Sequence, residues 1–403
     1  MLLAAIVASI AVGQAFALAG KIENPLLVHG GPGYAIFLLG GLFGSFVLSL
    51  GLAPSPAERR ALLLLGLVLA MGFFAADLVP RDAPEVLGAP LGALGLLAAA
   101  LAVVRAPAEE REPALRRLMA SALPPAFVIS TAPALLLTMT WHPLAYDGLI
   151  RAFDVTLGVE PAMHLAPLVD FALLANVAIR VYLATPVGFA VLYVAQERAP
   201  RRPPIDVLGA FALASFAGFA LYNVLPVVGP RYVLDVARPA AASLPLGPMV
   251  VPNVPRNCMP SLHTAWALLL FWHCRGKPLL VQIGVALFAT ITIFSTLAFG
   301  LHYLVDLVVA VPFALAAQAA AAPRSALRLP AITAGVMATI FWLFALRTGL
   351  LVRHPSALLS WLLVLMTAAG GLVLEALLWR ASRSDEVVDP SFALPGERQR
   401  GEA

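Results

Sequence analysis

The sequence predicts an all-α fold, a polytopic membrane bundle of about 12 transmembrane helices, and three observations support this prediction. Of the 403 residues, 61% are hydrophobic and only 12% are charged, whereas about half of the residues of soluble domains are apolar. The mean hydropathy is +0.90. Apolar runs near the roughly 20 residues that cross a bilayer recur from Met1 to about Trp379. They leave no stretch long enough for a separate soluble domain.

Each predicted span is an apolar run that ends at charged residues, prolines or glycines. Alanine-flanked positions near residue 17 of the first run resemble signal-peptide cleavage sites, but no basic residue precedes that run. We therefore expect the first span to be retained, with cleavage as the alternative. The spans are expected at residues 2–20, 34–52, 61–79, 86–104, 118–138, 171–196, 205–226, 262–274, 279–299, 301–322, 329–350 and 357–379.

The distribution of Lys and Arg predicts the orientation of the chain. With both termini in the cytoplasm, 17 of the 26 Lys and Arg residues lie inside, 8 lie outside, and Arg180 lies within a span. The positive-inside rule favours this orientation. The net charge of +4 is spread over short loops, so no nucleic-acid partner is expected. Frequent alanine and arginine indicate a bacterium of high genomic GC content, and hence a multi-pass protein of the bacterial plasma membrane.

Two long loops, residues 139–170 and 227–261, lie outside in this orientation. Long loops in compact proteins tend to carry function. In the first loop, apolar residues between Tyr146 and Asp154 recur at helical spacing, which predicts a helix lying in the membrane interface. We therefore expect the functional residues at the extracytoplasmic surface.

The two cysteines are not expected to form an intramolecular disulfide. Cys258 and Cys274 lie at opposite ends of one predicted helix, roughly 24 Å apart at 1.5 Å per residue. A disulfide requires Cα atoms within about 7 Å of each other.

Ionisable residues gather at the starts of two predicted helices. His302 and Asp306 are four residues apart, so on a helix they share a face within hydrogen-bonding reach. A carboxylate bonded to one imidazole nitrogen fixes the tautomer and leaves the other nitrogen free to attack. His263 follows Pro260 and Ser261, residues typical of helix starts, where free N–H groups favour a phosphate. The pattern predicts a His/His/Asp site that acts on phosphate esters.

The residues around this site resemble the type 2 phosphatidic acid phosphatase superfamily. That family has three blocks: Lys-x6-Arg-Pro, Pro-Ser-Gly-His and Ser-Arg-x5-His-x3-Asp. Order and spacing agree, with Arg for Lys in the first block, Leu for Gly in the second and Thr for Arg in the third. The matching residues are Arg231, Arg238 and Pro239; Pro260, Ser261, Leu262 and His263; and Ser295, Thr296, His302 and Asp306.

The resemblance implies a role for each matched side chain. His302 would be the nucleophile that forms a phosphohistidine, Asp306 its orienting partner, and His263 the general acid. The phosphate oxygens would be held by Arg231, Arg238 and Ser261. No cofactor is expected. No metal ion is expected either, because the sequence shows no cluster of metal ligands and Asp306 is committed to His302.

Less specific roles remain open for several residues. Ser261 alternatively serves only as a helix cap, and the two arginines of the first block only as loop cations. Arg180 and Arg256 are further candidates, because either would supply the charge lost where Thr296 replaces arginine. Within a span, Arg180 requires a partner or a wet cavity. Asp147 and Asp154 are better explained as solvated loop carboxylates than as site residues.

The resemblance also divides the chain into four segments. Residues 118–322 would form the six-helix phosphatase/phosphotransferase core. Residues 1–117 would be accessory N-terminal transmembrane helices, residues 323–379 two extra transmembrane helices, and residues 380–403 a disordered cytoplasmic tail.

The departures from the family pattern favour its inositolphosphorylceramide synthase-like branch, whose members are inositolphosphotransferases. A phosphodiester carries about one negative charge and a phosphomonoester about 1.5 to 2, so one fewer arginine suits a diester. The expected function is transfer of an inositol phosphate-like head group between lipids at the outer face. The partners would be membrane lipids: a phospholipid donor, with a lipid hydroxyl or water as acceptor.

Three alternatives remain. The same nucleophile would serve a hydrolase of lipid phosphomonoesters or polyprenyl diphosphates. Twelve spans are also typical of transporters, but the first and last six spans show no repeat and the motifs lie at one interface. A catalytically dead lipid-binding protein would keep the fold without turnover.

Overall fold

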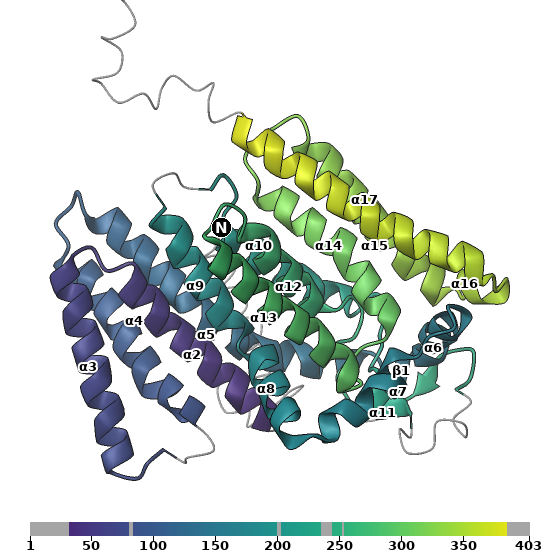
Figure 1. Ribbon diagram of the computed structural model, residues 1–403, viewed down its shortest axis with the longest axis horizontal. Coiled ribbons are helices and arrows are strands. Elements are labelled where there is room, and N and C mark those ends of the chain that lie inside the picture. The colour runs from purple at the N-terminus through teal and green to yellow at the C-terminus, as the bar shows by residue number, and fades with distance from the viewer. Residues whose placement is uncertain (1–31, 80–83, 200–202, 235–243, 252–253, 385–403) are drawn as a thin grey trace, which may run out of the picture.

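The computed structural model describes residues 32–79, 84–199, 203–234, 244–251 and 254–384 (Figure 1). Within these residues the protein is all-α apart from one short antiparallel ladder, in which β1 (Leu144–Ala145) pairs with β2 (Met249–Val250). This ladder joins the two long loops. The first expected span, residues 2–20, lies outside the described residues, as does most of the expected tail.

The helices vary widely in length, from single turns to 31 residues. They are α2 (Pro32–Gly51), α3 (Pro56–Ala75), η1 (Pro84–Leu87), α4 (Gly88–Arg105), α5 (Arg111–Trp141), α6 (Asp147–Thr156), α7 (Pro161–Leu165), η2 (Ala166–Asp170), α8 (Ala172–Leu183), α9 (Thr185–Glu197), α10 (Val207–Leu221), α11 (Pro230–Val233), α12 (Leu262–His273), α13 (Leu279–Ala298), α14 (Leu304–Ala321), α15 (Arg328–Arg347), α16 (Leu350–Arg353) and α17 (Ala357–Ser384).

In the part of the chain described, six helices are long and apolar enough to cross a membrane: α4 together with η1, α5, α13, α14, α15 and α17. A seventh arises if the segment Pro161–Asp170 and α8, which meet at a bend of 116°, form one broken span. The predicted count of twelve crossings is not confirmed. One reason is that α12 has only 12 residues, or roughly 18 Å of helix at 1.5 Å per residue.

The helix expected over residues 171–196 is interrupted in the structure. The structure replaces it with α8 and α9, which are separated at Ala184. Pro186 lies in the first turn of α9, where its missing N–H costs nothing. A proline also disfavours helical geometry at the residue before it, so Pro186 was the sequence signal for the break.

The helices that flank the bundle lie on opposite sides of it. Figure 1 shows α3 and α4 at one edge and α15 and α17 at the other, with α10, α12 and α14 between them. The main apolar core gathers Phe127, Phe211 and Trp266 from α5, α10 and α12. Phe37 of α2 belongs to the same core. A helix expected to be accessory therefore packs directly on the helices that carry the sequence motifs.

Close packing of α4 on α2 depends on three glycines, at positions 88, 92 and 95. A Cβ at Gly92 would lie 2.6 Å from the Leu42 carbonyl oxygen, and one at Gly95 would lie 2.7 Å from Phe46 Cα. Small residues let the backbones of membrane helices approach each other. The spacing of these glycines places them on one face of α4.

A second apolar core lies around α6. Phe153 of α6 packs edge-on against Trp342 of α15, with ring centroids 5.5 Å apart. Ile150, Val305 and Leu346 belong to the same buried cluster. The helix predicted to lie in the membrane interface packs against α14, α15 and α17, where its apolar face finds protein partners.

The C-terminal ends of α2, α9 and α12 lie together on one side of the bundle. The Gly51 carbonyl accepts a hydrogen bond from Arg198 Nε at 2.8 Å, and the Ala195 carbonyl accepts one from Lys277 Nζ at 2.7 Å. Gln196 and His273 are joined by a 2.9 Å hydrogen bond at the same level. The starts of α12 and α14, which carry the motif residues, consequently lie at the opposite end.

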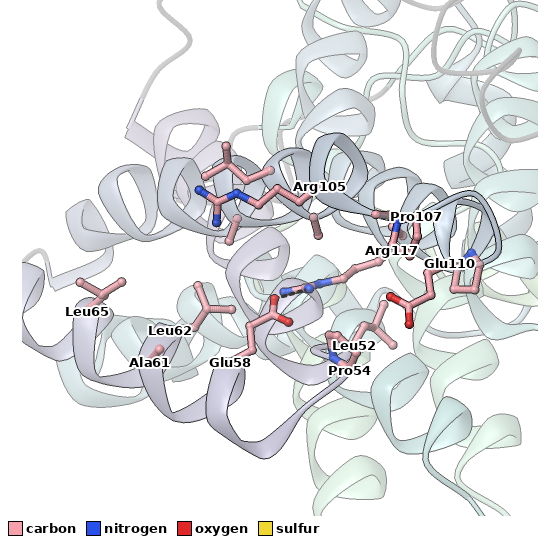
Figure 2. A pocket seen from close by; sticks show the side chains of 16 residues that line it. Leu52, Pro54, Glu58, Ala61, Leu62, Leu65, Arg105, Pro107, Glu110 and Arg117 are labelled. Carbon is pink, nitrogen blue, oxygen red and sulfur yellow. Dashed lines mark hydrogen bonds and ion pairs between the residues drawn. The ribbon is translucent and has the colours of Figure 1, made fainter.

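A cavity of about 610 Å³ lies between α3, α4 and α5 (Figure 2). Leucine and alanine side chains form most of its wall. Figure 2 shows Arg117 reaching across to Glu58, with which it forms a 2.5 Å ion pair, while Arg105 and Glu110 border the same space. The cavity is near the end of α2 and is lined by none of the motif residues. It is therefore separate from the candidate site.

The glycines of α4 generate a stability prediction. Gly92→Ala is expected to lower the melting temperature in detergent, because the added Cβ meets the backbone of Leu42 and α2 must shift. Overpacking of this kind costs about 1–3 kcal/mol. Gly72→Ala on α3 is the matched control, since nothing lies within 4 Å of its added Cβ, and it should keep or raise the melting temperature. Equal shifts in both variants would contradict close packing of α2 and α4.

Candidate active site

A tight turn between α13 and α14 places His302. Gly300 adopts φ +64°, a left-handed conformation that favours glycine. The Thr296 carbonyl accepts hydrogen bonds from the N–H groups of Leu301 and His302, both at 3.1 Å. These backbone hydrogen bonds thus fix the position of His302 at the end of the turn.

His302 precedes α14 instead of lying on it. Tyr303 is the N-cap of α14, and its N–H donates to Asp306 Oδ2 at 2.7 Å. The expectation that His302 and Asp306 share the face of one helix is therefore wrong in its geometry. Their side chains still meet, with His302 Nδ1 3.4 Å from Asp306 Oδ2.

Among the described residues, the shortest hydrogen-bonding contact of the His302 ring is to a backbone carbonyl. Nδ1 lies 2.9 Å from the Cys258 carbonyl oxygen, a normal hydrogen-bond length, whereas its 3.4 Å contact with Asp306 is long. When Nδ1–H donates to this carbonyl, the neutral ring carries a free lone pair on Nε2. Cys258 therefore fixes the tautomer, and Asp306 lies where it stabilises positive charge on the ring.

The Cys258 thiol is a partner that the sequence did not reveal. Its sulfur lies 2.7 Å from Asp306 Oδ2 and 3.4 Å from His302 Nδ1. Burial raises the pKa of this thiol, and the nearby carboxylates add to the effect, so the S–H remains a neutral donor. Asp306 Oδ2 accepts from both the thiol and the Tyr303 N–H. Among the described groups, Asp306 Oδ1 has no hydrogen-bond donor although it is buried.

Three side chains could offer ligands to one metal ion. The Cys258 sulfur, His302 Nδ1 and Asp306 Oδ2 all lie within 4.8 Å of one another and are buried. Thiolate, imidazole and carboxylate together suit zinc better than magnesium or calcium. The expectation that the chain has no cluster of metal ligands is therefore wrong. The sequence pattern missed it because Cys258 is 44 positions before His302.

The start of α12 lies beside the first turn of α14. The Ser261 N–H donates to the Asp306 carbonyl at 3.2 Å, and Ser261 is the N-cap of α12. Its hydroxyl oxygen accepts from the Thr264 N–H at 3.3 Å and lies 3.0 Å from the Thr264 hydroxyl. Ser261 is fully buried. Its side chain acts as a helix cap in this arrangement.

His263 is the second residue of α12 and has an aromatic environment. Its ring stacks on Tyr182 of α8, with centroids 3.6 Å apart and planes at 16°. Trp266 lies edge-on at 4.9 Å, and Phe37 of α2 lies at 6.3 Å. Two helices outside the motifs, α2 and α8, thus hold the orientation of His263.

Arg231 is docked onto the turn that carries His302. Its N–H donates to the Gly300 carbonyl at 2.7 Å, and its side chain is exposed. Gly229 adopts φ +99°, and a Cβ there would lie 2.4 Å from the Leu301 carbonyl oxygen. The glycine allows the two segments to approach closely. Arg238, the other arginine of the first motif, lies outside the described residues.

Arg256 has a structural role. Its side chain is 1% exposed, and its guanidinium donates to the carbonyls of His142 at 2.9 Å and Pro143 at 3.0 Å. It also donates to the carbonyls of Val251 and Val254. At least four of its five N–H groups are therefore bonded to carbonyls, and those that bond His142 and Pro143 join the two long loops beside the ladder of β1 and β2.

The remaining two candidates are also engaged away from His302. Arg180 has the partner that its position requires, because it forms a 2.5 Å ion pair with Glu85 of η1. Thr296 is fully buried, and its hydroxyl donates to the Ile293 carbonyl of its own helix at 2.6 Å. Its backbone contributes to the turn, as described above, whereas its side chain does not replace the missing arginine.

Two acidic residues of α6 are buried, which corrects their interpretation as solvated loop carboxylates. Asp147 is 0% and Asp154 is 2% exposed. Burial raises the pKa of Asp154 and raises that of Asp147 to about 6, against the opposing effect of hydrogen bonds from backbone N–H groups and from the Tyr303 hydroxyl. Their spacing of seven residues on a predicted amphipathic helix was the available signal, because it places both on one face.

The comparisons with known proteins give one match. Residues 149–320 match the family model described as PAP2 superfamily. This range begins in α6, ends in α14 and covers less than half of the chain. No curated protein and no solved structure matches the chain.

The environment of Asp147 generates a prediction of pH dependence. Its pKa is about 6 in the folded protein and near 3.9 in an unfolded chain, so the folded state binds more protons between about pH 4 and 6. The stability from this carboxyl is complete below about pH 4 and is lost as the pH rises through 6. The melting temperature of the wild type, relative to Asp147→Asn, should therefore fall over this window, by the equivalent of at most about 3 kcal/mol. Asp170→Asn, at an exposed carboxylate, is the control. Parallel curves for wild type and Asp147→Asn would contradict the prediction.

Proposed function

We propose that this membrane protein, whose residues 149–320 resemble the PAP2 superfamily, is a lipid phosphotransferase that works through a phosphohistidine at His302. One observation carries the proposal. The Cys258 carbonyl binds Nδ1 of His302 and Asp306 lies beside it, so Nε2 has the free lone pair that a nucleophile needs. Cys258, His302 and Asp306 all lie within residues 149–320, which match the family model.

Two displacements make up the proposed reaction. In the first, Nε2 of His302 attacks phosphorus, a P–N bond forms, and the bond to the leaving oxygen breaks as His263 gives that oxygen a proton. In the second, an acceptor hydroxyl loses its proton to His263 and attacks phosphorus, and the P–N bond breaks. Asp306 stabilises the positive charge that the His302 ring carries in between.

The phosphate would lie at the start of α12, where backbone N–H groups and the helix dipole favour an anion. Arg231 is positioned beside the His302 turn and is exposed to reach such a group. Arg238 is proposed as a second cation. Ser261 would act by holding the helix start in place, since its hydroxyl is already bonded within α12.

The charge of the site supports a phosphodiester substrate. Arg180 and Arg256 are both bonded elsewhere, and Thr296 is buried and turned away, so none of them restores the cation missing from the third motif. An ester with about one negative charge needs fewer cations than a monoester with 1.5 to 2. We therefore propose transfer of an inositol phosphate-like head group from a phospholipid to a lipid hydroxyl.

The site is proposed to face the extracytoplasmic side. It lies at the end of the bundle opposite to the C-terminal ends of α2, α9 and α12. Basic residues concentrate around that other end, which the positive-inside rule assigns to the cytoplasm. They include Arg59, Arg105, Arg198, Lys277 and Arg328.

Substrate assays test the proposal directly. Purified protein in detergent is incubated with labelled phosphatidylinositol, with and without ceramide or diacylglycerol, and separately with phosphatidic acid and a polyprenyl diphosphate. Acceptor-dependent turnover of the first substrate is expected. His302→Ala should abolish both turnover and a covalent phosphoenzyme, while His354→Ala, at an exposed histidine, should retain them. Hydrolysis of the phosphomonoester alone would assign a phosphatase, and equal behaviour of wild type and His302→Ala would refute the catalytic site.

A chelator distinguishes this chemistry from a metal centre. EDTA is expected to leave turnover unchanged, because Asp306 Oδ2 and His302 Nδ1 are already bonded within the protein. Loss of turnover with EDTA, restored by zinc but not by magnesium, would instead assign a metal to Cys258, His302 and Asp306.

A further inference from the structure

We propose that α6 is a positioning element of the active site. Asp147 holds the segment that leads to Arg231, Asp154 holds the start of α14 that follows His302, and together they fix these two segments relative to each other. The proposal rests on the function given above and extends it to two residues outside the sequence motifs. It also gives a role to helices outside the matched range.

Asp154 caps α14 from a different helix. Its Oδ2 accepts from the Leu304 N–H at 2.6 Å, and its Oδ1 accepts from the Val305 N–H at 3.1 Å. These N–H groups belong to the first turn of α14, where no intrahelical carbonyl is available to them. His302 is two residues before Leu304. Asp154 therefore fixes the backbone from which the catalytic imidazole projects.

Asp147 holds the segment that leads to Arg231. Its Oδ2 accepts from the Val228 N–H at 3.1 Å, and its Oδ1 accepts from the Gly229 N–H at 2.9 Å. The Tyr303 hydroxyl also donates to Oδ1 at 3.1 Å. Asp147 thus joins the arginine segment to the residue that follows His302.

Carboxylates suit these two positions because each must accept from several donors. A carboxylate accepts at both oxygens, whereas an asparagine replaces one acceptor by an NH₂ group that would face another N–H. Both aspartates are almost fully buried, which is unfavourable unless their hydrogen bonds are satisfied. Loss of either side chain leaves buried N–H groups without an acceptor.

The length of α6 sets the spacing of the two attachment points. Asp147 and Asp154 are seven residues apart, about two turns or 10.5 Å along the helix. Phe153, between them, packs on Trp342 of α15. Because α15 lies beyond the residues matched by the family model, we infer that the added C-terminal helices hold α6 and so keep the site aligned.

The two aspartates should affect different kinetic constants. Asp154→Ala should lower kcat about 10- to 100-fold, because a shift of His302 by about 1 Å spoils its attack, while KM changes little. Asp147→Asn should raise KM about 10-fold with a smaller change in kcat, because it loosens the Arg231 segment. Tyr303→Phe removes only the link between the two segments and should give a milder defect in both constants.

The matched control is Asp206→Ala. Asp206 caps α10 by accepting from the N–H groups of Leu208 and Gly209 at 2.9 and 3.3 Å, next to the end of α9 and away from His302. A similar loss of melting temperature with unchanged kcat is expected. Equal loss of kcat in Asp154→Ala and Asp206→Ala would overturn the proposal, since the effect would then be general destabilisation.

Hydrogen exchange provides a readout that does not depend on turnover. Mass spectrometry should show faster amide exchange at residues 304–305 in Asp154→Ala and at residues 228–229 in Asp147→Asn, with exchange elsewhere unchanged. If Asp154→Ala does not fold, Asp154→Asn replaces it. A wild type without turnover would refute the proposed function. Hydrogen exchange would still test the positioning role of α6: selective acceleration at these residues supports it, and unchanged exchange overturns it.

Discussion

The start of α14 is the constraint on which the site depends. A helix leaves its first N–H groups without carbonyl partners, and in an apolar environment each of them needs an acceptor. Asp306 accepts from the Tyr303 N–H, and Asp154 accepts from the next two. Because His302 immediately precedes this helix start, the same hydrogen bonds that satisfy the backbone also fix the position of His302.

Burial of several carboxylates at one end of the bundle follows from this requirement. Asp147, Asp154 and Asp306 are all almost inaccessible, and each one accepts backbone N–H groups. Isolated carboxylates would be costly there, so their donors explain why they persist. The Cys258 thiol adds a neutral donor to Asp306 without adding charge. The result is a buried polar layer around the start of α14.

Helices outside the family match are part of the same construction. Phe37 of α2 lies against His263, and Trp342 of α15 holds α6. The cavity between α3, α4 and α5 lies at the other end of the bundle and touches none of these residues. The added helices therefore divide into those that support the site, α2 and α15, and those that flank the far end. Tertiary packing, and not the order of the segments along the chain, draws this division.

The sequence by itself determined the all-α membrane fold, because apolar runs of bilayer length have few other solutions, and it identified His263, His302 and Asp306 as candidates through their spacing and family pattern. It did not reveal the roles of Cys258, Asp147 or Asp154, because their partners are 43 to 156 positions away along the chain. The break at Ala184 was signalled by Pro186, but the apolar run concealed it. Tertiary structure alone decided which arginines are engaged elsewhere, since Arg180 and Arg256 find their acceptors only when distant segments meet. Hydrophobic length is a local property of a chain, whereas the satisfaction of buried polar groups depends on the whole fold.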